Sequence, residues 1–219
     1  MKIEQALSPN YTKGRKGKKI IAIVNHITAG LMPGTLSWMR NPVAKASAHY
    51  LVTRDGKVIQ MVNDSDTAWH AGFVNRPSWK LYDGTNPNAY TLGIEHENIG
   101  GGLLTEVQYE ATLWLHKYLI DKYNIPVDRN HIIGHFEIDA INRPNDPGSY
   151  FPWERLIADL KEDEEMIYKT YNDVPDWGKP IVKKLMDRKT IVGDGKGNIN
   201  LPESTLKTLV YLEREKVLK

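Results

Sequence analysis

The segment 18–25 constrains the fold more than any other part of the chain, because it contains an unbroken apolar run. Residues 20–24 are five consecutive apolar residues, and four of them are β-branched. Short runs of this kind are typical of a strand that is buried on both faces. Such a strand needs helices or loops on both sides of its sheet. The segment therefore predicts a layered α/β domain.

Three further segments are predicted to contribute strands to the same sheet. Residues 49–62 hold two apolar stretches around Asp55-Gly56, and Asp-Gly in this position predicts a β-hairpin. Residues 91–97 and 131–135 are short apolar segments that also favour strands.

Two helices are expected between and after these strands. Thr105 and Gln108 have the spacing of a capping box, which predicts a helix that ends near Tyr123. Pro152 is expected to begin a second helix. Strands that alternate with helices, together with a hairpin, predict a central mixed β-sheet flanked by helices.

The composition changes near residue 161, where five consecutive charged residues begin. We therefore expect residues 1–160 to form the main domain and residues 161–170 to form a linker. Residues 171–219 are expected to form a small, mainly helical C-terminal module, with a glycine-rich turn at 193–197 between its two helices.

Composition excludes several classes of protein and of site. The 219 residues carry a net charge of +2, which leaves no dense basic patch for nucleic acid. No segment approaches the ~18 consecutive apolar residues of a membrane span, so membrane insertion is not expected. Met1–Asn10 lacks the apolar core of a signal peptide, which predicts synthesis in the cytoplasm. The chain has no cysteine, so any metal site must be built from histidines and carboxylates.

Two histidines and one aspartate have positions that suit a metal site. His26 follows the first predicted strand, and His135 ends the apolar segment that begins at residue 131. Asp146 lies eleven residues after His135, before Pro147 and Gly148, in a loop that can fold back on the strand end. Two histidines and a carboxylate with one open position form a catalytic zinc arrangement. Taken singly, each residue favours a structural role: His26 as a hydrogen-bonded histidine at a strand end, and Asp146 as a turn-capping residue.

The strand at 91–97 offers a second carboxylate. Strand alternation places Glu95 and Glu97 on one face and His96 on the other. A glutamate beside a zinc site can serve as a general base. The alternative is an exposed edge strand whose glutamates form salt bridges. His116 is expected to be structural, because it lies in the middle of a predicted helix. His131 is four residues before His135, but Gly134 and the β-branched residues between them disfavour a helix, and no glutamate follows His131, so the helical zinc motif is absent.

Six short motifs occur along the chain in one order. They are His26-x-Thr28, Ser47-Ala48-His49-Tyr50, Ala68-Trp69-His70-Ala71-Gly72, Thr91-Leu92-Gly93-Ile94-Glu95, Gly134-His135-x-Glu137 and Asp146-Pro147-Gly148. Together they resemble the zinc-dependent N-acetylmuramoyl-L-alanine amidases, a family that includes phage lysins, muropeptide amidases and peptidoglycan recognition proteins. The resemblance covers roughly residues 15–160. It implies a mixed sheet with a groove for a glycan-linked stem peptide.

The resemblance also implies roles for individual residues. The zinc ligands would be His26, His135 and Asp146, and Glu95 would be the catalytic acid–base. Many family members carry a lysine where this chain has Pro144, and we expect Arg143 to replace that cation. The substrate-binding candidates are His70, His49, Trp69 and Asn98. The residues expected to orient the ligand imidazoles are Asn25, Thr28 and Glu137.

The function implied is zinc-dependent hydrolysis of the amide between N-acetylmuramic acid and L-alanine in bacterial peptidoglycan. We expect a phage or prophage endolysin that is released from the cytoplasm to the wall. A cytoplasmic muropeptide-recycling amidase, a catalytically silent peptidoglycan-binding module, and a wall glycosidase or stem peptidase are the alternatives. The C-terminal module is expected either to bind the cell wall or to mediate self-association.

Overall fold

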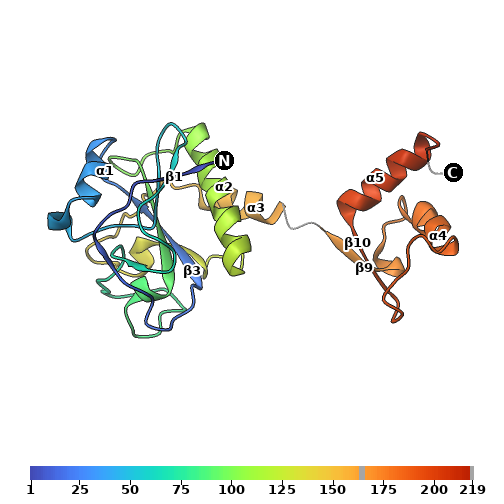
Figure 1. The fold of residues 1–219 in the computed structure, drawn as a ribbon, viewed down its shortest axis with the longest axis horizontal. Helices are drawn as coiled ribbons and strands as arrows, with labels where there is room; N and C mark the ends of the chain where they lie inside the picture. Colours follow the sequence, from blue (N-terminus) through green and yellow to red (C-terminus); the bar gives the residue numbers. More distant parts are fainter. Residues whose placement is uncertain (163–165, 218–219) are drawn as a thin grey trace. The chain divides into compact units, whose positions relative to one another are not determined.

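The chain folds into two compact units, Met1–Lys161 and Glu162–Lys219, in a computed structural model that describes residues 1–162 and 166–217 (Figure 1). Part of the expected linker 161–170 lies outside the described residues, at 163–165. The rest of it differs from expectation, because strand β9 (Ile167–Thr170) already belongs to the second unit. The second unit therefore begins before residue 171.

The first unit is built on a six-stranded mixed sheet in the order β1-β5-β4-β7-β3-β8, which confirms the predicted fold class. The β4–β5 pair is antiparallel, and the other four pairs are parallel. The strands of this sheet are β1 (Ile3–Gln5), β3 (Ala22–Ile27), β4 (Tyr50–Val52), β5 (Val58–Gln60), β7 (Thr91–His96) and β8 (Ile132–Gly134). A separate two-stranded sheet pairs β2 (Tyr11–Thr12) with β6 (Thr67–Ala68).

The central strand β3 begins and ends later than the apolar run predicts. Ile20 and Ile21 precede it, and the strand continues through Asn25 and His26 to Ile27. His26 is therefore part of the strand and not the residue after it. The predicted hairpin is present as β4 and β5 around Asp55-Gly56.

One face of the sheet is covered by helix α2 (Glu106–Tyr123), whose Ala111, Leu115 and Leu119 pack against strands β3, β4, β5 and β7. The Thr105 hydroxyl accepts the backbone N–H of Gln108, as the capping-box spacing predicts. Helix α3 (Trp153–Glu162) packs its Leu156 and Leu160 against the same helix and strand β8. These contacts fix which side chains of each strand point away from α2.

The opposite face is covered by short elements and loops, and it carries the polar site described below. The short elements are helix α1 (Gly34–Met39) and the 3-10 turns η1 (Pro42–Ala44), η2 (Pro87–Ala89) and η3 (His135–Glu137). Met39 packs beneath β4 and β5, and Trp79 packs against β3 and β8. Loops that reach over a sheet without a covering helix leave room for a groove on this side.

The second unit is mainly helical, as expected, and also contains a two-stranded sheet that the sequence did not predict. Strands β9 and β10 (Asn198–Pro202) pair antiparallel. The turn η4 (Tyr171–Asp173) and helix α4 (Lys179–Asp187) lie between them along the chain, and helix α5 (Glu203–Arg214) follows β10. The core contains buried residues from both strands and both helices, Tyr168, Leu201, Val182 and Leu206, together with Val174, which follows η4. In neither unit does a described helix have the length and apolarity that crossing a membrane requires.

The packing of α2 on the sheet gives a test of the fold. Leu115 is fully buried in the α2–sheet core, so Leu115→Ala should lower the free energy of unfolding by about 2–5 kcal/mol. Urea denaturation followed by tryptophan fluorescence reports mainly on the first unit, which holds five of the six tryptophans. Leu103→Ala is the matched control, because Leu103 is 77% exposed. Equal effects of the two substitutions would contradict the assignment of this core.

Candidate metal centre

Three side chains converge at the carboxyl end of β3. Nδ1 of His26 lies 3.1 Å from Nδ1 of His135, and Oδ2 of Asp146 lies 3.4 Å and 3.0 Å from these two nitrogens. Parallel pairing of Asn25 with Gly134 places His135, the next residue, beside His26. The residues that the sequence identifies as the ligand set are therefore brought together in space.

The loop that carries Asp146 is anchored at both the backbone and the side chain. Phe136 donates its N–H to the carbonyl oxygen of Asp146 at 3.0 Å, and Ile27 donates its N–H to Oδ1 at 2.8 Å. The hydrogen bond from Ile27 occupies Oδ1 and turns Oδ2 toward the two imidazoles. The aspartate thus presents one oxygen to the centre, whereas the alternative interpretation gave it only a turn-capping role.

The donor set fits a zinc ion. Zinc holds nitrogen and oxygen ligands at about 2.0–2.1 Å in a tetrahedron, so neighbouring ligand atoms lie about 3.3–3.4 Å apart. The three distances found here, 3.0–3.4 Å, match that spacing. Imidazole nitrogens with one carboxylate oxygen are also a chemically suitable set for zinc.

The protonation states of these groups favour a cation. Burial, partly opposed by a hydrogen bond to Asp146, lowers the pKa of His26, so its imidazole is neutral near pH 7. Burial opposes ionisation of Asp146, but interactions with the facing imidazoles of His135 and His26 outweigh it and lower the pKa of the carboxyl. A neutral imidazole and an ionised carboxylate are the forms that bind metals.

Glu95 lies beside this centre on the neighbouring strand. Its register partner is His26, so both side chains leave the sheet on the same face. β7 lies between β4 and β3, so the alternative of an exposed edge strand is wrong. Oε2 of Glu95 is buried and has no hydrogen-bond partner among the described residues. Burial, followed by repulsion from Asp146, raises the pKa of Glu95 well above its ordinary value.

Two cavities, of about 500 and 480 Å³, border the centre and share Trp69, His70, His135 and Arg143 in their walls. The first also reaches Phe73, which is 85% exposed, and the second reaches Trp38, which is 54% exposed. Sequence reasoning missed both aromatic residues, because only the fold shows that they border the site.

Arg143 is the cation nearest to the centre in this loop. Its side chain is exposed and lines both cavities, and its charge lowers the pKa of Glu95 against the effect of burial. Among the described residues its side chain makes one hydrogen bond, a long one of 3.4 Å from Nη1 to the carbonyl oxygen of Asn142. Arg143 is therefore placed where a cation in this loop can face a bound substrate.

His70 and Trp69 line both cavities, as expected for groove residues. The indole N–H of Trp69 donates to Oγ1 of Thr12, which fixes the ring at the cavity wall. His70 also contacts a metal-ligand candidate, because its Nδ1 lies 3.0 Å from Nε2 of His26. Burial lowers the pKa of His70 well below its ordinary value, so its imidazole is neutral.

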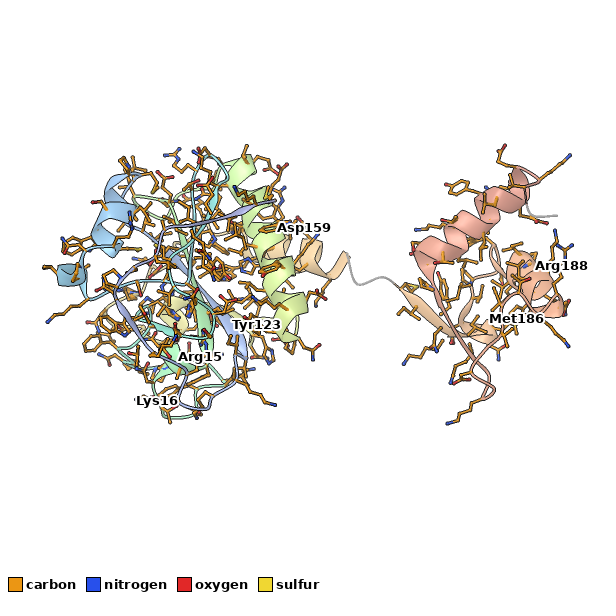
Figure 2. The ribbon with its side chains drawn as sticks, in the orientation of Figure 1. Arg15, Lys16, Tyr123, Asp159, Met186 and Arg188 are labelled. Atoms are coloured by element: carbon orange, nitrogen blue, oxygen red, sulfur yellow. The ribbon has the colours of Figure 1, made fainter. Side chains whose placement is uncertain are left out.

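His49 and Asn98 differ from the expectation that they contact substrate. His49 is fully buried, and its ring nitrogens contact the Arg15 guanidinium and the backbone N–H of Gly93. Arg15 is itself inside the first unit, where it is labelled in Figure 2. Oδ1 of Asn98 accepts three backbone N–H groups of residues 100–102 and so shapes that loop. Neither residue lines the two cavities at the centre.

The residues expected to orient the ligand imidazoles also have other partners. Asn25 donates to the carbonyl of Ile133, and the Thr28 hydroxyl donates to the carbonyl of Gly30. Glu137 accepts the backbone N–H of Gly134 and thereby supports the turn that carries His135. None of these hydrogen bonds reaches a ligand imidazole, and Glu137 supports His135 only through the backbone of the turn.

Comparison with known proteins decides the family. The family model described as N-acetylmuramoyl-L-alanine amidase (Amidase_2) matches residues 16–149, which include the three ligand candidates and Glu95. The chain belongs to this amidase family. The resemblance drawn from the six short motifs is confirmed at the level of the family and of its enzyme activity.

Individual members of the amidase family show how far the similarity extends. N-acetylmuramoyl-L-alanine amidase A of Achromobacter lyticus is 30% identical over 167 residues, which are 68% of this chain and 86% of that protein. The 1,6-anhydro-N-acetylmuramyl-L-alanine amidase AmpD of Haemophilus influenzae is 35% identical over 118 residues, 53% of this chain and 60% of that protein.

A solved structure of another member, the amidase AmiD of E. coli, was determined with anhydro-N-acetylmuramic acid-L-Ala-D-gamma-Glu-L-Lys. It is 29% identical to this chain, with a TM-score of 0.56 over 64% of this chain and 57% of that one. The fold and the family are thus shared with a protein whose bound substrate is a muropeptide.

The geometry of the centre predicts how zinc binding responds to loss of one ligand. The wild-type chain should bind about one zinc ion, and Asp146→Ala should weaken binding strongly because only two donor groups remain. Competition with a chromophoric chelator measures the dissociation constant. Asp55→Ala is the control, because the Asp55 side chain is 60% exposed and pairs only with neighbouring residues. If Asp146→Ala bound zinc as tightly as Asp55→Ala, the ligand assignment would be wrong.

Proposed function

We propose that this chain hydrolyses the amide between N-acetylmuramic acid and L-alanine in peptidoglycan with the help of one zinc ion. The observation that carries the proposal is the convergence of His26, His135 and Asp146 beside the unpartnered carboxylate oxygen of Glu95. The family and its named members support the choice of bond.

The ion and Glu95 divide the chemistry between them. When bound, zinc lowers the pKa of water toward neutrality and polarises the scissile carbonyl. Glu95 accepts a proton from the attacking water at its buried oxygen and passes it to the nitrogen of the leaving L-alanine. Its raised pKa makes the carboxylate a stronger base toward the attacking water. A group that both accepts and donates a proton works best when its pKa lies near the operating pH.

Arg143 supplies positive charge for the oxygen of the carbonyl under attack. The residue lies in the loop that carries Asp146, one position before the proline that replaces the lysine of many family members. A fixed cation near developing negative charge stabilises a transition state. We therefore assign the oxyanion role to Arg143.

The two cavities provide room on both sides of the reacting bond. They share walls at the metal centre, so a substrate whose scissile amide lies there can extend into both. Exposed aromatic residues at a groove mark a binding surface. We propose that Trp38, Trp69 and Phe73 contact the glycan and stem peptide.

The biological role proposed is that of a phage or prophage endolysin that is made in the cytoplasm and acts on the wall after release. The support is the second unit, which has a core of its own and exposes Trp177 and Tyr211. We propose that this unit holds the enzyme on the wall. The second candidate role is muropeptide recycling, which the similarity to AmpD favours.

Glu95→Gln gives the sharpest test of the reaction. The substitution keeps the size of the side chain but removes the proton acceptor, so kcat should fall by about 10²–10⁴-fold while zinc binding is retained. Digestion of purified walls with end-group labelling measures the product. The wild type should release amino-terminal L-alanine without new reducing sugars.

Two results of this assay would refute the proposal. New reducing ends would identify a glycosidase, and wall binding without turnover in the zinc-loaded wild type would identify a silent binding module. Chelation should abolish turnover, and added zinc should restore it. Digestion of intact walls in preference to soluble muropeptides distinguishes the endolysin from the recycling enzyme.

The role of the second unit is tested by sedimentation with purified walls in the presence of chelator. Tyr211→Ala and Trp177→Ala should each reduce the bound fraction, because both side chains are exposed in this unit. Tyr118→Ala is the matched control, since Tyr118 is an exposed tyrosine on α2, on the sheet face opposite the metal centre. Unchanged binding, with dimers seen by light scattering that either substitution dissociates, would favour self-association.

A further inference from the structure

We propose that His70 is a positioning residue for the metal centre, which accepts the Nε2–H of His26 and thereby presents Nδ1 of His26 as the ligand nitrogen. This inference rests on the zinc site of the proposed function. It gives His70 a different task from the substrate contact that the sequence predicts.

The hydrogen bonds around His70 fix the direction of donation along a chain of four groups. The Thr91 hydroxyl donates to the carbonyl of Pro87 at 2.9 Å, so a lone pair on its oxygen faces Nε2 of His70 at 3.2 Å. Nε2 of His70 therefore carries the hydrogen of the neutral imidazole, and its Nδ1 is an acceptor.

The same logic continues to His26. Nδ1 of His70 lies 3.0 Å from Nε2 of His26, so that nitrogen of His26 is the donor. The other nitrogen, Nδ1, is then unprotonated, and it is the atom that lies 3.1 Å from His135 and 3.4 Å from Asp146. A ligand histidine whose second nitrogen donates to a fixed acceptor is held in one tautomer and one orientation.

Gly93 leaves the space that the His70 ring occupies. A Cβ atom at position 93 would lie 2.5 Å from Cγ of His70, closer than side-chain carbons pack. Thr91, Gly93 and Glu95 alternate along β7 and so share the face that carries the site. The ring of His70 thus lies over Gly93, with Thr91 at one end and His26 at the other.

The backbone of His70 is also held in place, by hydrogen bonds to the side chain of Asn88. Oδ1 of Asn88 accepts the N–H groups of His70 and of Ala71, at 3.2 and 2.7 Å. His70 is only 9% exposed, and both of its ring nitrogens have protein partners. Little hydrogen-bonding capacity remains for a substrate, which is why we assign the residue to the metal and not to the groove.

The test measures zinc affinity on the full chain by chelator competition, together with the visible absorption spectrum of the Co²⁺-substituted protein. His70→Ala should weaken zinc binding by about 10–100-fold and change the Co²⁺ spectrum. His70→Gln should recover part of this loss, because its amide oxygen can accept the Nε2–H of His26. Thr91→Val should weaken binding less than His70→Ala, because it removes only the acceptor that fixes the His70 tautomer.

His131→Ala is the control, because His131 pairs with Asp128 away from the centre and should leave zinc affinity unchanged. If His70→Ala and Thr91→Val bound zinc like the wild type and only raised KM, His70 would be a substrate contact and the inference would be overturned. A wild-type chain that binds no zinc would refute the proposed function and this inference together. Far-UV circular dichroism of each variant shows whether the fold is retained. A weaker zinc affinity counts for the inference only in variants whose circular dichroism matches that of the wild type.

Discussion

Parallel pairing of β7 with β3 and of β3 with β8 is the constraint on which the rest of the site depends. This register sets His26 opposite Glu95 and brings His135 to the same edge of the sheet. Because α2 packs on the other face, a shift of β3 by one residue would turn His26 into the apolar core. The hydrophobic packing of the sheet and the chemistry of the site therefore specify the same register.

The polar side of the sheet is organised in layers around this register. Glu95, the three ligand candidates and His70 all line one of the cavities, and the ring of His70 fills the space over Gly93. Buried polar groups are tolerated because almost every one has a defined partner. The buried oxygen of Glu95 is an exception, and an unpartnered carboxylate oxygen beside a metal-ligand set is where a reacting water would bind.

Much of this arrangement could be predicted from the sequence, because it depends on local patterns. The apolar run before Asn25, the Asp55-Gly56 turn and the Thr105 cap all define elements within a few residues. His49 could not be placed in this way, since its burial beside Arg15 arises from segments 34 residues apart. The β9–β10 pair was missed for a similar reason, because residues 167 and 202 meet only in the folded second unit.

The central claim is that a single zinc ion is held by His26, His135 and Asp146, and anomalous X-ray diffraction at the zinc edge tests it most directly. The account predicts one strong anomalous peak within bonding distance of Nδ1 of both histidines and Oδ2 of the aspartate. A peak bound through Nε2 of His26, or one located away from these three residues, would contradict it.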